Sequence, residues 1–422
     1  MIEELQKRPF VRPLFLWITG ICCYVFLPFQ WVIPALLTFL LVSLILSNNE
    51  AIPKYSNRWH WGIVFSLLLL TLSILFSAWR DMYGGNNGWM MQLQSHAVFA
   101  REALLSRLNL IEMADDKRKV LGAMLLGDTG MLDRQIRMQF SVTGVAHILS
   151  VSGFHVAVVC GFFSFLLRPL PSIGPFKWIK YIATLLLLWS FTLISGFAPP
   201  SVRSALMLTF FLTGQVINRT TDGYNTLAAS AFIMLVYNPF FLFDIGFQLS
   251  YLAVWFILLL HGPLERLMEI RNPLLAEPYG WIVVSISAQI GTSFLCMYYF
   301  SQFPTLFLFT NLPFSLVSMI LIPAGLIYML LPTSFPGVSL LGEALDKMMS
   351  FLMYIVESFS AFPWASFIVP FDFIDLILAY TFLFFVVLFL YKKRPMNLLL
   401  SFIFLALLFI KLLIESLWLP AI

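Results

Sequence analysis

Polar side chains that could carry chemistry gather in three short segments of an otherwise apolar sequence. The first segment contains two histidines and two serines, namely His147, Ser150, Ser152 and His155. On a continuous helix, His147, Ser150 and His155 would lie on roughly one side. The Ser152-Gly153 pair could instead break the helix and expose its backbone to a cavity. A structural alternative stays open, in which hydroxyls bond back to their own helix and each histidine pairs with a neighbour.

The second segment surrounds a pair of prolines at residues 199–200. Ser195-Gly196 precedes the pair, and Ser201 is expected to cap the helix that follows it. Arg203 then lies in the first turn of an apolar helix. Its guanidinium could snorkel to lipid headgroups, contact a phosphate, or pair with a buried carboxylate.

The third segment follows a backbone break expected at Asn238-Pro239. Asp244, Gln248 and Tyr251 share one helical face at spacings of four and three residues. Asp244 lies in a long apolar stretch and needs a cation or water around it. We therefore expect an ion pair between Arg203 and Asp244, with a purely structural polar brace as the alternative.

The composition around these segments is that of a membrane protein. Of the 422 residues, 60% are apolar and only 11% are charged, against about 25% charged residues in soluble domains. A soluble fold has too little interior for so much apolar surface, so lipid must cover the rest. Because polar groups cost several kcal/mol in lipid unless they are paired or hydrated, the three segments are the natural candidates for function.

The apolar runs predict an all-α polytopic membrane protein with about 10–13 spanning helices, since one span needs about 20 apolar residues. The expected spans are 13–27, 30–47, 60–79, 145–168, 178–196, 200–217, 226–242, 244–260, 279–300, 303–331, 340–363, 373–391 and 397–418. Several are short or broken by Pro or Gly. Broken spans must lie inside the bundle or line a cavity, because unpaired backbone groups are not tolerated in lipid.

Basic residues set the expected orientation, because loops rich in Lys and Arg stay cytoplasmic. They flank the spans at Lys7, Arg8, Arg12, Lys54, Arg58, Arg168, Lys177, Lys180 and residues 392–394. This pattern places the N-terminus in the cytoplasm and residues 80–118 outside. The expected organisation is a three-span region at 1–79, an external segment at 80–118 and a second multi-span region at 119–422.

The external segment begins with a turn-rich loop, Gly84-Gly85-Asn86-Asn87-Gly88, and continues into an amphipathic helix over residues 93–112. Its apolar positions are Val98, Leu104, Leu105, Leu108 and Ile111. The helix could lie on the membrane surface or pack against the bundle, and the sequence favours neither.

The sequence indicates no cofactor and no metal site. Its four cysteines lie in apolar runs and lack metal-ligand spacing, as is typical of small buried hydrophobes. No Gly-x4-Gly-Lys-Ser/Thr loop for a nucleotide is present.

The three segments together resemble the ComEC family of competence membrane proteins. Gly127-Asp128, Thr143-Gly144 and residues 147–155 are similar to its pattern G-D…T-G-x-x-H-L-L-A-x-S-G-x-H. Ser195-Gly196 and residues 201–205 are similar to its S-G…x-x-R-A block. Residues 225–228 and 238–250 resemble its N-x-L-A…N-P…D-x-G-F-Q-L-S block. Order and spacing agree across about residues 120–260.

This resemblance implies a channel, not an enzyme, that passes single-stranded DNA across the inner membrane during natural transformation. The expected pore residues are His147, Ser150, Ser152, His155, Ser195, Arg203 and Gln248. Helix N-termini would add positive dipoles along the path. Asp244 is expected to serve structurally, as the partner of Arg203. The sequence has no nucleotide-binding loop that could power transport of the strand. A cytoplasmic ATPase or recombination protein is therefore implied as a partner, together with a DNA receptor outside the cell. Whether the chain forms a homodimer is left open.

In the long form of the family, the channel is accompanied by an external domain that resembles an OB fold and by a C-terminal domain that resembles a metallo-β-lactamase nuclease. Residues 80–118 are too short for the first, and a His-x-His-x-Asp-His motif for the second is absent. The expectation is therefore a channel-only version.

Two functions from other classes compete with the DNA channel. Broken helices near the membrane centre would suit a secondary transporter of a small solute, although no internal repeat is found. An intramembrane enzyme could use His, Ser and Asp at membrane depth, but Gly-x-Ser-x-Gly and His-Glu-x-x-His motifs are absent. A scaffolding role without a pore is a further alternative.

Overall fold

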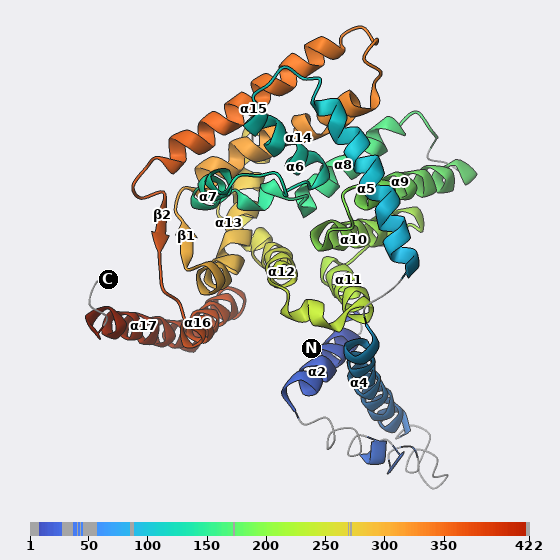
Figure 1. Ribbon diagram of the computed structural model, residues 1–422. Helices are drawn as coiled ribbons and strands as arrows, with labels where there is room; N and C mark the ends of the chain where they lie inside the picture. Colours follow the sequence, from blue (N-terminus) through green and yellow to red (C-terminus); the bar gives the residue numbers. More distant parts are fainter. Residues whose placement is uncertain are drawn as a thin grey trace.

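The computed structural model describes residues 8–27, 57–84, 88–171, 174–268, 270 and 272–418, with a few helical residues between 37 and 44. Within these ranges the fold is all-α apart from two short strands (Figure 1). The expected span at 30–47 lies largely outside the described residues. So do Lys7, Lys54 and residues 85–87 of the turn-rich loop.

Within the described ranges, helices follow one another along the chain. Their bounds are α2 (Val11–Phe26), α4 (Asn57–Tyr83), α5 (Gly88–Leu108), α6 (Asp115–Leu126), α7 (Arg134–Val142), the 3₁₀ helix η1 (Ala146–Leu149), α8 (Gly153–Leu166), α9 (Pro175–Ile194), α10 (Pro199–Val216), α11 (Gly223–Tyr237), the 3₁₀ helix η2 (Pro239–Phe243), α12 (Ile245–Glu265), α13 (Pro273–Phe300), α14 (Phe307–Leu330), α15 (Val338–Ser360), α16 (Phe373–Lys392) and α17 (Pro395–Trp418). Strands β1 (Gln302–Pro304) and β2 (Ser366–Ile368) pair antiparallel.

Seven of the described helices are long and apolar enough to cross a membrane, namely α4, α9, α12, α13, α14, α16 and α17. Three shorter apolar helices, α2, α8 and α11, accompany them. The prediction of an all-α polytopic membrane protein with several short spans is confirmed. The chain is a membrane protein.

Three of the expected spans differ in the structure. The run at 200–217 forms α10, which is not among the helices apolar enough to cross a membrane. The run at 145–168 is not one helix: η1 ends at Leu149, the backbone at Ser150 is extended, and α8 begins at Gly153. The run at 340–363 forms α15, whose charged side chains at Glu343, Asp346, Lys347 and Glu357 disqualify it as an apolar span. It is an amphipathic helix with one buried face.

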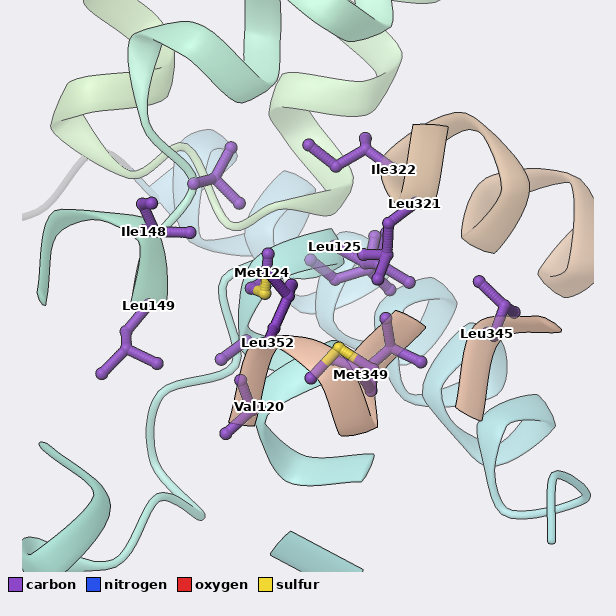
Figure 2. Packing of buried hydrophobic residues seen from close by; sticks show 14 of the residues in the cluster. Val120, Met124, Leu125, Ile148, Leu149, Leu321, Ile322, Leu345, Met349 and Leu352 are labelled. Carbon is purple, nitrogen blue, oxygen red and sulfur yellow. The ribbon is translucent and has the colours of Figure 1, made fainter. Parts of the chain in front are cut away.

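The largest core surrounds the C-terminal half of α6, where seven consecutive residues from Val120 to Leu126 are buried (Figure 2). A helix buried on all sides must be covered by neighbours on all sides. Side chains of α14 and α15, such as Leu321, Leu345 and Met349, close over it. Leu125 also fills the space beside Gly325, where a Cβ would lie 2.5 Å from its Cδ1.

The amphipathic helix expected in the external segment is α5, and it packs against the bundle. Leu108 and, beyond the helix end, Ile111 are buried in the same core, with Leu104 and Leu105 partly buried beside them. Val98 is instead exposed. The C-terminal half of α5 therefore packs against the helix bundle, which is one of the two alternatives that the sequence left open. The boundaries expected near residues 79 and 118 stay predictions.

Helices α2, α4 and α11 run in the same direction. Arg12 and Tyr24 of α2 bond Ser66 and Asp81 of α4 at 3.0 and 2.8 Å. At the start of α2, the Phe10 amide donates to Asn225 Oδ1 of α11 at 2.9 Å. All three helices therefore begin at one end of the bundle and finish at the other.

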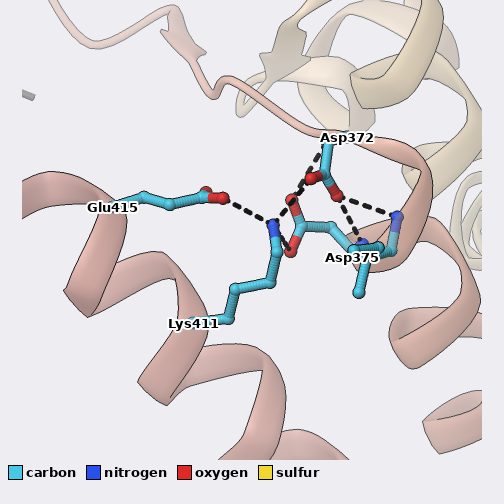
Figure 3. A network of polar contacts seen from close by, with 5 residues as sticks. Asp372, Asp375, Lys411 and Glu415 are labelled. Atoms are coloured by element: carbon cyan, nitrogen blue, oxygen red, sulfur yellow. Dashed lines mark hydrogen bonds and ion pairs between the residues drawn. The ribbon is translucent and has the colours of Figure 1, made fainter.

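The C-terminal helices form two antiparallel pairs, α12–α13 and α16–α17. At the end of α17, Lys411 Nζ lies 3.0, 2.9 and 2.7 Å from carboxylate oxygens of Asp372, Asp375 and Glu415 (Figure 3). Asp375 is fully buried. The ammonium ties the start of α16 to the end of α17, and β1–β2 links the same end to α13.

The α12–α13 contact provides a matched test of the packing. A Cβ on Gly291 would lie 2.5 Å from the Phe256 ring and 2.7 Å from its Cβ, whereas a Cβ on Gly280 of the same helix would meet nothing within 4 Å. We expect Gly291→Ala to lower the free energy of unfolding by about 1–3 kcal/mol through overpacking. Gly280→Ala should be neutral or stabilising by up to about 1 kcal/mol. Thermal unfolding in detergent measures both, and equal effects would contradict the close approach.

Candidate functional site

The first two turns of α10 contact the starts of two other helices. Ser201 Oγ donates to the Val151 carbonyl, just before α8, at 3.3 Å. A Cβ on Gly153, the first residue of α8, would lie 2.9 Å from Ser204 Oγ. Arg203 Nη2 donates to the Gly246 carbonyl in the first turn of α12 at 2.9 Å. We refer to this convergence of the starts of α8, α10 and α12 as the polar junction.

Two helix ends reach the same place. Gly127 ends α6 in a left-handed conformation (φ 75°). A Cβ on Gly127 would lie 3.4 Å from the Ser195 carbonyl oxygen and 3.4 Å from the Val151 side chain. Ser195 in turn ends α9. The Gly127-Asp128, Ser150–Ser152 and Ser195-Gly196 segments, which are far apart in sequence, therefore meet in space.

A capping interaction explains why the chain breaks before α8. Ser152 Oγ accepts from the His155 amide, and the Ser152 amide donates to His155 Nδ1 at 3.0 Å. This reciprocal cap satisfies donors that a helix start leaves unpaired. Because Nδ1 accepts a hydrogen bond, the neutral ring carries its proton on Nε2. Nε2 is buried and has no partner among the described residues.

The two histidines of this segment have different surroundings. His155 is fully buried, whereas His147 in η1 is exposed, although protein atoms surround its position at longer range. The expectation that His147, Ser150 and His155 share one helical face is wrong, because the helix restarts at Gly153, after His147 and Ser150 and before His155. Ser150 is half-buried and donates to the His147 carbonyl at 3.4 Å. Of the four polar residues in this segment, His147 is the exposed one.

Two other expected pore residues act as local braces. Ser195 is buried and donates to the Thr192 carbonyl of its own helix at 3.0 Å. Gln248 is half-buried, and both ends of its amide are used. Its Nε2 donates to the Leu242 carbonyl at 3.0 Å, and its Oε1 accepts from the Tyr299 hydroxyl at 2.9 Å. Their contacts fit the structural alternative.

Arg203 is the most unusual group of the junction. Its side chain is only 1% exposed, and Nε and Nη1 have no hydrogen-bond partner in the described part of the chain. Besides the Gly246 carbonyl, its guanidinium lies over the Tyr251 ring at 5.9 Å. A buried cation with free donors is costly unless an anion or water completes its shell.

The expected ion pair between Arg203 and Asp244 is wrong as a direct contact. Asp244 is exposed, and its Oδ1 accepts from the Phe247 amide at 2.7 Å as the N-cap of α12. No ion pair joins it to Arg203 among the residues described. Both side chains instead bond to the first turn of α12: Arg203 donates to the Gly246 carbonyl, and Asp244 accepts from the Phe247 amide.

Charges of both signs surround the buried Arg203. Three helix starts contribute partial positive charge and Arg203 adds a full one, whereas the ends of α6 and α9 and the Asp244 carboxylate contribute negative charge. Pro199 and Pro200 have no N–H groups, so the start of α10 offers few backbone donors. An anion here would therefore be held mainly by side chains.

Sequence reasoning missed Arg101 of α5. Its Nη1 would lie 3.4 Å from a Cβ on Gly196, in the turn between α9 and α10. Its spacing on an amphipathic helix gave no sign of this contact.

One group of described residues has the composition of a metal site: Asp372, Asp375 and Glu415, whose oxygens lie within 4.8 Å of one another. The Lys411 ammonium already lies against all three carboxylates (Figure 3). This arrangement is that of an ion-pair network between helices.

The fold and the junction define a polytopic helical membrane protein whose helices break around a buried cation. The chain belongs to the competence protein family, whose family model matches residues 124–395. The match covers the junction and leaves out Arg101. The ComEC resemblance seen in the sequence is confirmed.

Curated relatives agree with this family. The chain is 27% identical over 253 residues to ComE operon protein 3 of Bacillus subtilis, covering 60% of this chain and 29% of that protein. It is 25% identical over 177 residues to Recombination protein 2 of Haemophilus influenzae, covering 41% of this chain and 22% of that protein. The chain thus matches less than a third of the length of either relative. No solved structure matches it.

The role of Asp244 can be tested by separating its cap from its charge. Asp244→Ala should lower the free energy of unfolding by about 1 kcal/mol, since the helix loses its N-cap. Asp244→Asn should keep most of the stability, because asparagine caps equally well without the charge. Thermal unfolding of both variants in detergent measures the difference. If Asp244→Asn lowers the free energy of unfolding as much as Asp244→Ala, the stabilisation comes from attraction between the Asp244 charge and Arg203, and not from the cap.

Proposed function

We propose that this chain takes part in DNA uptake during natural transformation, by passing one DNA strand across the inner membrane along the polar junction. The observation that carries the proposal is the buried Arg203, with two free donors at the meeting point of three helix starts. The family and the names of its competence and recombination relatives support the same role.

The junction suits a phosphate backbone that must move. A single-stranded polyanion needs positive potential along its path and aromatic faces for its bases. Arg203 and the helix dipoles supply the first. Phe154, which is 38% exposed and packs 6.4 Å from Trp281, offers an aromatic face next to the start of α8. Few strong charges favour transport, since a strand that binds tightly leaves slowly.

The ends of the bundle support an orientation with the N-terminus in the cytoplasm. Contacts from Arg8 to Asp222 (3.2 Å), Tyr181 to Thr213 (2.7 Å) and Tyr391 to Leu259 (2.8 Å) bring the basic segments to one end. These segments contain Arg8, Arg12, Lys177, Lys180, Arg219, Lys392, Lys393 and Arg394. The other end contains Asp81, Asp244, Asp372, Asp375 and Glu415, together with Arg80 and Lys411. By the positive-inside rule, the basic end faces the cytoplasm and the junction lies toward the outside.

The proposal is a transport role without catalysis. The hydroxyl of Ser152 caps α8, and its neighbour His155 is held by the same cap, so this serine–histidine pair is not directed at a substrate. The energy for strand transfer would come from a cytoplasmic ATPase or recombination protein. A receptor outside would deliver the DNA, and a second copy of the chain would be a further partner.

A transformation assay tests the path. His147→Ala combined with Arg203→Gln should lower transformation by about tenfold or more, since each charge-assisted contact is worth about 1.5–3 kcal/mol. His261→Ala is the matched control, because His261 lies at the other end of α12 and pairs with Glu265. The amount of protein in the membrane must be compared in parallel. A double variant that accumulates and transforms normally would remove the junction from the DNA path.

Cysteine labelling tests the orientation. Lys393→Cys and Ile368→Cys place thiols at exposed sites on the basic and the opposite end. An impermeant maleimide added to intact cells should label Cys at 368 and leave 393 unlabelled until the cells are opened. The wild-type chain is the background control, since none of its four cysteines is exposed. The reverse pattern would invert the bundle.

A further inference from the structure

We propose that Arg101 and the turn at Gly196 form a phosphate-binding subsite at the outer entrance of the polar junction. The inference rests on the proposed function, and it adds a contact from α5, outside the part of the chain that the family model matches. The ligand is the phosphodiester of the DNA backbone.

Arg101 has the features of a group that awaits an anion. No hydrogen bond or ion pair of Arg101 is formed within the described residues, and its Nε is buried without a partner. Its Nη1 lies against the Gly196 turn, where a Cβ would be only 3.4 Å away. Gly196 itself is exposed and has φ 85°, so the turn presents backbone rather than a side chain beside the guanidinium.

The structural explanation for Arg101 would be neutralisation of the C-terminal end of α9, where carbonyls favour cations. Three of the last four carbonyls of α9 are already used. The amides of Ser195, Gly196 and Phe197 donate to the carbonyls of Phe191, Leu193 and Thr192 at 2.9, 2.9 and 3.0 Å. Asp128, next to Gly127 at the same turn, forms no ion pair with Arg101 either. The Arg101 guanidinium therefore neither bonds to the carbonyls at the end of α9 nor forms an ion pair with Asp128.

Arg101 and Arg203 are arranged from the surface inward. Arg101 is partly exposed, while Arg203, beyond the same turn and one turn into α10, is 1% exposed. Both carry buried donors without partners. A strand that approaches the junction would meet Arg101 before Arg203, so the two guanidinium groups would hold different phosphates.

The salt dependence of DNA binding tests the subsite. For single strands, each lost phosphate contact reduces the slope of log K against log salt by about 0.7. Binding of a fluorescein-labelled oligodeoxythymidine to the full chain in detergent is followed by anisotropy at several NaCl concentrations. Arg101→Gln should lower the slope by about 0.7, and Arg101→Lys should restore it. Arg107→Gln is the charge-matched control on the same helix, because Arg107 is bonded to the Leu331 carbonyl. Its slope should not change.

The outcomes separate this inference from the function on which it rests. If Arg101→Gln keeps the slope while Arg203→Gln lowers it, the subsite is wrong and the DNA path stands. If the wild-type chain binds no oligonucleotide, both fall. Lipid phosphate is the other source of the same chemistry. Loss of co-purified phosphatidylglycerol from Arg101→Gln without any change in slope would therefore assign Arg101 to lipid and overturn the inference.

Discussion

The hydrogen bond from Arg203 to the Gly246 carbonyl is the contact around which the central helices are arranged. A guanidinium buried to 1% exposure requires acceptors in its immediate surroundings. Gly246 has no side chain to block the approach to its carbonyl, and Asp244 fixes the turn that presents it. On the other side of α10, the break before α8 leaves the Val151 carbonyl for Ser201. Interrupted helices thus provide the backbone acceptors that hold α10 in place.

Composition and apolar run length were sufficient to predict the membrane fold, because lipid exposure demands both. The three polar segments also stand out in an apolar sequence, and the structure brings them close together. Their geometry was not predictable. The apolar pattern runs through residues 145–168 without interruption, and only the cap between Ser152 and His155 shows where the helix restarts. Asp244 was assigned to Arg203 as the nearest charge, but a local amide competes for a carboxylate at a helix start.

Burial of α6 shows a second limit of the sequence. Its first turn carries Asp115, Asp116, Lys117 and Arg118, which is typical of a solvated surface, and its apolar half is far too short for a span. Yet that half is the centre of the largest core (Figure 2). The reason is tertiary: α14 and α15 enclose it, and Gly325 admits Leu125 at close range. No window of the α6 sequence contains that information.

The position of α6 also bears on how the junction is supported. Its rigid, fully packed half ends at Gly127, against the Ser195 carbonyl and Val151, so the core holds the junction from one side. The α11–α12 region, which carries Asp244 and Gly246, belongs to a different apolar cluster with α2. The junction therefore lies where two apolar clusters meet at α10: Ala205 belongs to the first cluster, and Val202 and Leu206 pack against the second. Ser201 and Arg203 add bonds to backbone carbonyls on either side. If DNA passes here, the strand need not open either core, because Arg203 lies where the two clusters meet and not inside either of them.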